Sequence, residues 1–168
     1  MVAFSSDAQL VASGWWGGTV RLWDAATRSE RDTLEYHSHR VDYWHRIRAV
    51  AFPPDGLLMA SGLEDGTVKF WDAATGSARG MLEGHWSEVS AVAFSPDGQL
   101  VALGLEDSTI RLWDMVTRSM RGTLKSYSGV VNAVAFSPDS QLMTSESEFG
   151  LFMLWDAATG SQRHTLGA

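Results

Sequence analysis

The stretch AVAFSPDGQL, residues 91–100, decides the fold because the chain repeats it. AVAFSPDSQL follows at residues 133–142, AVAFPPDGLL precedes it at 49–58, and the chain opens on MVAFSSDAQL. The dipeptide Trp-Asp recurs with the same period: Trp23, Trp71, Trp113 and Trp155 lie 48, 42 and 42 residues apart. Because two separate motifs share one period, the sequence predicts four copies of one structural unit.

Each copy contains four short runs with strand character. In the third copy, apolar residues at 91–94, 99–104, 109–114 and 120–124 are separated by polar turns such as SPDG. Proline and Asp-Gly supply the backbone dihedral angles of tight turns. Four strands in about 42 residues leave no room for a helix, which is typical of a β-propeller blade. We therefore expect an all-β protein with four four-stranded antiparallel blades per chain.

The blades are expected to form one array over residues 1–168. Their predicted bounds are approximately 1–36, 48–84, 90–126 and 132–168. The longer first interval places a six-residue insert near residues 42–47, because LEYHSHRV aligns with LEGHWSEV.

These motifs resemble WD40 repeats over essentially the whole chain. Their amino-acid sequences are most similar to the near-identical repeats of fungal NACHT-type proteins, the NLR-like proteins of the heterokaryon-incompatibility kind. The resemblance implies a buried network in each blade, which links a histidine, a serine or threonine, an aspartate and the repeat tryptophan. The residues that match it are His37, Ser61, Asp65 and Trp71; His85, Asp107 and Trp113; Ser13 and Trp23; and Ser145 and Trp155. The two outer copies keep fewer members than the two middle ones.

Four blades do not fill a disc. If blades step by about 51° in a seven-bladed ring, four of them cover about 206°, whereas two chains supply eight blades at about 45° each. We therefore expect a homodimer that closes an eight-bladed ring. In the fourth copy GLFMLWD replaces GTVRLWD, so the candidate interface residues are Phe149, Leu151, Phe152 and Met153. An alternative is that the chain is an excised part of a longer sensor array.

The composition excludes several classes of function. A formal charge of -7 argues against a nucleic-acid binder, which needs a basic face. The chain has no cysteine, no apolar run long enough to span a bilayer and no signal peptide, which predicts a soluble cytoplasmic protein without membrane contact. His37, His39 and His45 cluster in sequence, but no further ligand is fixed beside them, so we expect neither a metal nor a cofactor. No catalytic motif is present, and we expect no enzyme activity.

Aromatic residues that are not repeated point to a binding surface. In propellers of this family the turn between the second and third strands shares one face of the disc with the segments between blades. Tryptophan, tyrosine and arginine dominate the energetics of protein interfaces. The candidate partner-binding residues on that face are Trp15, Trp16, Tyr43, Trp44, His45, Arg46 and Trp86. The predicted function is a non-catalytic scaffold that binds an unknown protein or peptide; the alternative is a propeller that binds a small molecule or glycan.

Overall fold

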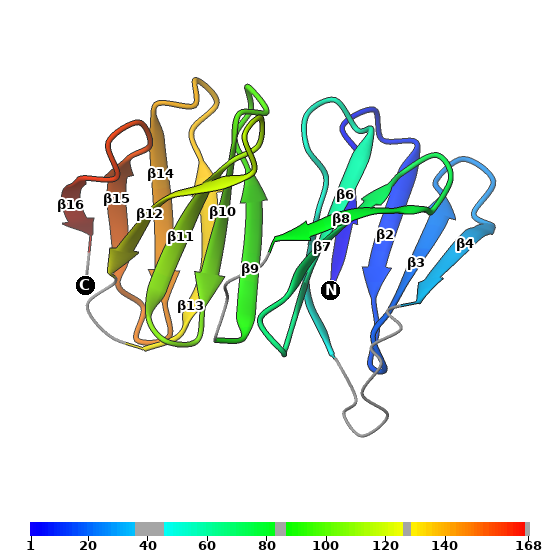
Figure 1. Cartoon of the computed structure of the whole chain (residues 1–168), viewed down its shortest axis with the longest axis horizontal. Helices are drawn as coiled ribbons and strands as arrows, with labels where there is room; N and C mark the ends of the chain where they lie inside the picture. Colours follow the sequence, from blue (N-terminus) through cyan, green and yellow to red (C-terminus); the bar gives the residue numbers. More distant parts are fainter. Residues whose placement is uncertain (36–45, 83–86, 126–128, 167–168) are drawn as a thin grey trace.

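Sixteen strands follow one another in the computed structural model, which describes residues 1–35, 46–82, 87–125 and 129–166 (Figure 1). Each group of four consecutive strands forms one antiparallel sheet in chain order, and we call these sheets blades 1 to 4. The described residues contain no helix that is long and apolar enough to cross a membrane. The predicted all-β fold with four four-stranded blades is confirmed.

The strand bounds repeat closely from blade to blade. Blade 1 comprises β1 (Val2–Phe4), β2 (Leu10–Gly14), β3 (Thr19–Asp24) and β4 (Glu30–Glu35). Blade 2 comprises β5 (Ile47–Ala51), β6 (Leu58–Leu63), β7 (Val68–Asp72) and β8 (Ala78–Leu82). Blade 3 comprises β9 (Val89–Phe94), β10 (Leu100–Leu105), β11 (Thr109–Asp114) and β12 (Ser119–Lys125). Blade 4 comprises β13 (Val131–Phe136), β14 (Leu142–Ser147), β15 (Phe152–Asp156) and β16 (Gln162–Leu166).

The repeated SPDG motif forms the turn between the first and second strands of a blade. In blade 3 the Ser95 hydroxyl donates to Asp97 Oδ1 (2.5 Å) and accepts from the Leu100 amide (2.9 Å). Asp97 Oδ1 also accepts from the Gln99 amide (3.0 Å), and Gly98 adopts a φ of 72° that favours glycine. The motif therefore sets the hairpin through local hydrogen bonds, as the turn residues predicted.

The Trp-Asp dipeptide ends the third strand and shapes the turn to the fourth. The aspartate of each blade accepts a hydrogen bond from the amide of the threonine three residues later, for example Asp72 Oδ1 from Thr75 (2.8 Å). The register shifts by one residue just before the tryptophan in all four blades, at Leu22/Trp23 in blade 1. Such bulges increase the local twist of a sheet. The dipeptide thus fixes both the bend and the turn.

The hydrophobic core lies between blades rather than at one centre. Three clusters of buried residues fill the three joints between successive blades. In the first joint Val20, Leu22 and Leu34 of blade 1 pack against Met59 and Trp71 of blade 2. Alternate residues of each strand point to opposite faces, so a central blade uses both of its faces in this way.

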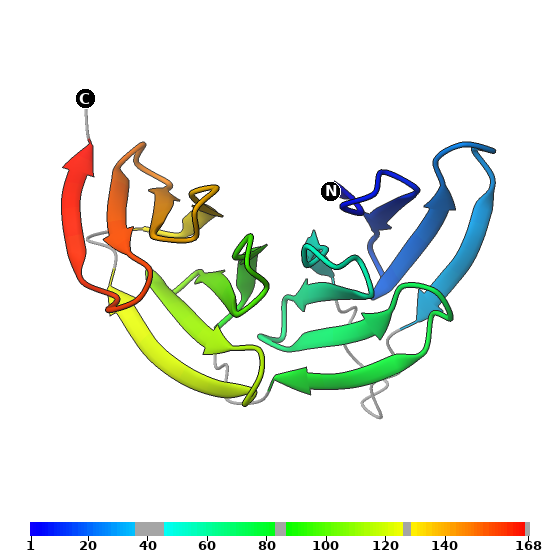
Figure 2. The same ribbon diagram turned by 90° about the horizontal axis from the view of Figure 1, so that it is seen from above.

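The four blades form an open arc (Figure 2). The first strands β1, β5, β9 and β13 line the concave inner side, and the fourth strands lie at the outer edge. The two chain ends lie at opposite ends of the arc. One face of blade 1 and one face of blade 4 consequently have no neighbouring blade in the chain.

The insert ends earlier than the sequence alignment predicted. Ile47, which the alignment placed in the insert, is the first residue of β5 and is buried in the joint with blade 1. It occupies the position of Val89 and Val131, each of which begins the first strand of its blade. The physical reason is that a β-branched apolar side chain is needed there to pack on Gly14. Residues 42–45 of the predicted insert lie outside the described residues.

Candidate protein-interaction surface

The turn between β2 and β3 presents two adjacent tryptophans that point to different places. Trp16 is 76% exposed, and the guanidinium of Arg46 lies 3.6 Å from its ring centroid. Trp15 instead faces the uncovered side of blade 1, where Arg21 lies 5.0 Å from its ring and Ser13 Oγ accepts a hydrogen bond from its Nε1 (3.0 Å). The structure thus separates the two candidate residues into two surfaces.

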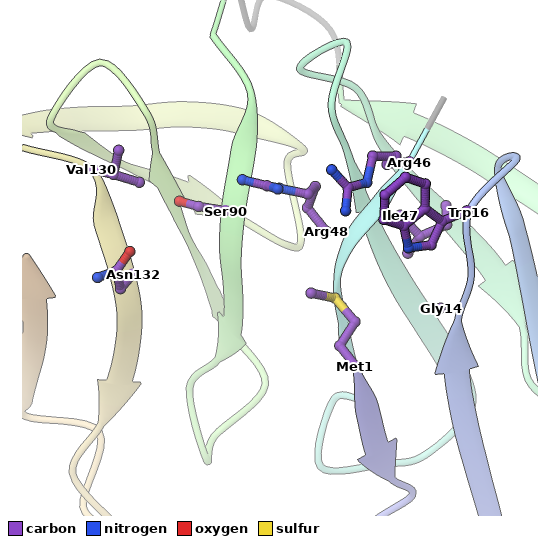
Figure 3. A pocket seen from close by; sticks show the side chains of 9 residues that line it. All are labelled: Met1, Gly14, Trp16, Arg46, Ile47, Arg48, Ser90, Val130 and Asn132. Atoms are coloured by element: carbon purple, nitrogen blue, oxygen red, sulfur yellow. The ribbon is translucent and has the colours of Figure 1, made fainter. Parts of the chain in front are cut away.

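Trp16 and Arg46 border a pocket of about 280 Å³ on the concave inner side of the arc, at the rim where the first strands begin (Figure 3). We call it the rim pocket, and it is lined by Met1, Gly14, Trp16, Arg46, Ile47, Arg48, Ser90, Val130 and Asn132. Arg48, Ser90 and Asn132 are equivalent residues of β5, β9 and β13. The lining therefore differs in chemistry from blade to blade although the backbone repeats.

An ion-pair network joins blades 2 and 3 beside the rim pocket. Arg48 pairs with Glu88 through Nε and with Glu106 through Nη2, the latter at 3.2 Å. Burial raises the pKa of the Glu88 carboxyl; Arg48 opposes this shift, and the neighbouring carboxylates of Glu106 and Glu64 add to it. The positive charge of Arg48 is thus largely compensated within the protein, whereas among the described residues no carboxylate pairs with Arg46.

Trp16 occupies a position that carries glutamate in the other blades. Glu64, Glu106 and Glu148 are its equivalents in the turns of blades 2, 3 and 4. The amides of these glutamates donate to the carbonyls of Arg46, Glu88 and Val130, each the residue just before a first strand. This repeated backbone contact holds the turn against the start of the first strand of the same blade, so it does not depend on which side chain the position carries.

The serine and tryptophan of the expected structural network are joined in three blades. The indole Nε1 of Trp23, Trp71 and Trp155 donates to Ser13, Ser61 and Ser145 Oγ at 2.8, 2.9 and 2.9 Å. In blade 3 buried Leu103 stands in place of the serine beside Trp113. Asp65 and Asp107 each accept a hydrogen bond from the amide two residues later, Thr67 (2.9 Å) and Thr109 (3.0 Å).

Several predicted residues lie outside the described part of the chain. These are His37, Tyr43, Trp44, His45, His85 and Trp86, together with His39 of the histidine group. Within the ranges that the structure describes, no group of three histidine, aspartate or glutamate side chains is arranged to hold a metal ion.

The four candidate interface residues of blade 4 do not share one surface. Phe152 is exposed on the uncovered face, and Leu151 is half-buried. Phe149 lies in the turn between β14 and β15 beside Gly129, at the rim. Met153 is fully buried with Trp155 in the joint between blades 3 and 4. The interface prediction needs correction at Met153, because adjacent strand residues point to opposite faces of a sheet and only Phe152 points outward.

Sequence reasoning named no interface residue on the uncovered face of blade 1. It forms an apolar concavity of about 470 Å³, lined by Val2, Phe4, Val11, Ser13, Trp15, Trp23, Asp24, Ala25 and Arg28. The signal was available in the repeats, because the equivalents of Val2, Phe4 and Val11 in blade 2 are Val50, Phe52 and Met59, which belong to the core of the first joint.

Comparison with known families agrees with this architecture. A sequence profile of the family "WD domain, G-beta repeat" matches residues 1–24, 31–72, 76–114 and 118–156. The chain belongs to the WD40 repeat family. Each WD40 match ends at the aspartate of a Trp-Asp dipeptide, and the last three matches run from the outer strand of one blade through the first three strands of the next.

A solved structure gives the same fold. This WD40 chain is similar to a chain in "Crystal Structure of Mitotic Checkpoint Complex", with a TM-score of 0.87 and 26% sequence identity. The match covers 99% of this chain and 50% of that chain, so this WD40 chain spans about half the length of its structural relative. A search of curated proteins found no match.

Proposed function

We propose that this WD40 chain is a non-catalytic scaffold that binds a protein or peptide partner at the rim pocket. The observation that carries the proposal is the exposed Trp16 side chain, stacked by Arg46 at the mouth of a 280 Å³ pocket. Exposed tryptophan and arginine are the residue types that contribute most to protein interfaces. WD40 propellers are in general protein-interaction scaffolds, and the structural relative is part of a protein complex.

The variation among the repeats supports the same surface. Residues that hold a blade together recur at the four Trp-Asp turns, whereas Trp16, Arg46, Arg48 and Asn132 each stand where other blades carry different chemistry. A stack of indole on guanidinium also stiffens both side chains before a partner arrives, which lowers the entropic cost of binding.

The test is affinity capture followed by titration with the purified partner. The bait would be the wild type, Trp16→Ala, or the control Val116→Ala, whose side chain is exposed in the turn between β11 and β12. We expect Trp16→Ala to weaken the affinity for the partner at least 10-fold, about 1.4 kcal/mol or more, and Val116→Ala to leave it unchanged. A partner that binds all three equally would contradict a site at the rim pocket.

The aromatic turn also allows a glycan ligand. Arg46 covers one face of the Trp16 ring and leaves the other open for stacking, whereas the Nε1 of Trp15 is already bonded to Ser13. A glycan array that retains the wild-type protein and loses Trp16→Ala would favour this alternative.

We further propose that two copies complete an eight-bladed disc. Support comes from the open arc of four blades and from the match to half of a propeller chain. The alternative is that additional blades of a longer chain, such as the sensor array of a fungal NACHT-type protein, complete the disc. The solution mass of the 18.4 kDa chain distinguishes them, because only pairing doubles it.

A further inference from the structure

We propose that the uncovered face of blade 1 is a docking site for the uncovered face of blade 4 of a second copy, so that the two copies join head to tail. The inference rests on the proposed pairing of two chains and names the surfaces that form the joint. We call the blade 1 surface the acceptor face and the blade 4 surface the donor face.

The three joints inside the chain define what an acceptor face receives. In blade 2, Val50, Phe52, Met59 and Trp71 lie beneath side chains of blade 1. Blades 3 and 4 use Val92 and Phe94, and Val134 and Phe136, in the same way. The acceptor face of blade 1 carries the equivalent residues Val2, Phe4, Val11 and Trp23 around its 470 Å³ concavity. The geometry of this face therefore suits a blade and not an unrelated segment.

The donor face carries the other half of the same contact. Blade 1 presents Ala12, Val20, Leu22 and Leu34 to blade 2, and blade 3 presents Ala102, Ile110, Leu112 and Leu124 to blade 4. The equivalents on blade 4 are Thr144, Phe152, Leu154 and Leu166. Phe152 and Leu166 are exposed. Phe152 is larger than Val20, Val68 or Ile110 at the same position, which suits the volume of the open concavity.

One residue of the donor face differs from its equivalents in the internal joints. Gly14, Gly62 and Gly104 lie against Ile47, Val89 and Val131 of the next blade, where an added Cβ would come within 2.6, 2.5 and 2.8 Å of a side-chain carbon. Blade 4 carries Glu146 at that position. A first strand packed as in the internal joints would meet the Glu146 side chain, so the joint with a second copy differs from the internal joints at this end.

Charged side chains also lie on the acceptor face. Arg28 and Asp24 line it, and Arg21 stacks on Trp15 there and pairs with Glu30. The cations of this face are therefore accompanied by carboxylates, and the pairing rests on the apolar residues that the two faces share with the internal joints.

The experiment measures the mass of variants alone and in mixtures by light scattering over a dilution series. Phe152→Asp changes the donor face and Phe4→Asp the acceptor face; both side chains are exposed in the single chain, so each blade keeps its core. Val116→Asp is the matched control, because Val116 is exposed away from both faces. An unpaired carboxylate buried in an apolar joint should weaken pairing by about 100-fold or more.

The head-to-tail joint predicts a specific pattern of recovery. Each face variant should be monomeric alone, and the control should match the wild type. An equimolar mixture of Phe152→Asp and Phe4→Asp should again form dimers, because the donor face of the Phe4→Asp chain and the acceptor face of the Phe152→Asp chain make one intact joint. The second joint of the disc then carries both aspartates, so the mixed dimer should be weaker than that of the wild type. Circular dichroism of each variant checks that a loss of pairing is not a loss of fold.

Two other outcomes would overturn the inference, and they differ. If the wild type is dimeric and Phe4→Asp remains dimeric, the copies pair through other surfaces, so the head-to-tail joint is wrong while pairing stands. If the wild type is monomeric at all concentrations, both the joint and the eight-bladed disc are wrong, and binding at the rim pocket is unaffected.

Discussion

The joints inside the chain and its two open ends use the same repeat positions in opposite ways. Leu124 is 7% exposed in the joint between blades 3 and 4, whereas its equivalent Leu166 is 56% exposed at the end of the arc. Ile110 is fully buried, and its equivalent Phe152 is 43% exposed. The difference shows that burial in this protein is a property of neighbouring blades, not of the individual repeat.

The largest effect is expected inside a joint. Phe70 is 1% exposed and packs with Val101 and Leu103 across the joint between blades 2 and 3. Phe70→Ala should lower the free energy of unfolding by about 3–5 kcal/mol, because it removes buried surface and leaves a cavity. Urea unfolding followed by tryptophan fluorescence measures it. A loss below about 1 kcal/mol would mean that the joints do not carry the stability of the chain.

A matched pair of leucines tests the comparison itself. In the Phe4→Asp background, which is expected to keep the copies apart, Leu124→Ala should cost about 2–4 kcal/mol and Leu166→Ala less than about 0.5 kcal/mol. The two leucines occupy one repeat position, so the difference isolates the effect of a covering blade. Equal losses at the two positions would contradict the open end face of blade 4.

The serine–tryptophan hydrogen bond allows a covered blade and an open blade to be compared at one position. Ser61→Ala should destabilise by about 1–3 kcal/mol, because it leaves the Nε1 of Trp71 unpaired in a buried site. Ser13→Ala should cost less, about 0.5–1 kcal/mol, because Trp23 is half-buried on the open face and water can replace the serine. Unfolding by urea at neutral pH gives both values. A loss of stability for Ser13→Ala as large as that for Ser61→Ala would contradict the comparison.

The smallest expected effect is that of an aspartate–arginine ion pair on the pH dependence of stability, and it should be equal in an inner blade and an outer blade. Hydrogen bonds from Arg79 (2.6 Å) and Arg163 (2.5 Å), with further ones from Thr75 and Thr159, lower the pKa of Asp72 and Asp156 from 3.8 to about 2. Because the pKa in the folded state is the lower one, the stabilisation is present above about pH 4 and is lost as the pH falls toward 2.

Each pair lies within one blade and is exposed, so no neighbouring blade is involved. Arg79→Met and Arg163→Met should therefore reduce the loss of stability between pH 5 and pH 3 to a similar and small extent. Urea midpoints at the two pH values measure it. A much larger change for Arg79→Met than for Arg163→Met would show that the pair in blade 2 also depends on the joints.

The strands and turns were predictable because their causes are local. The SPDG turns and Trp-Asp turns form through hydrogen bonds within about five residues, for example those of Ser95 and Asp97. Each of the four predicted runs of the third copy overlaps its strand, from β9 to β12. Repetition of a local pattern four times then makes the number of blades certain.

What sequence reasoning missed depends on contacts between blades. The alignment placed Val41 opposite Val89, but Ile47 packs on Gly14 and so holds that position in β5. Met153 was taken for an interface residue because it is apolar in place of arginine or lysine, yet strand alternation turns it toward blade 3. Trp15 and Trp16 are neighbours in the turn after β2, and they line two different surfaces.

The measurement that tests the account most directly is the solution mass of the wild-type chain by light scattering on a sizing column across a dilution series. The account predicts a mass near twice 18.4 kDa that falls to a single chain only at high dilution. A mass of 18.4 kDa at every concentration would contradict it, because the acceptor and donor faces would then remain uncovered in the free protein.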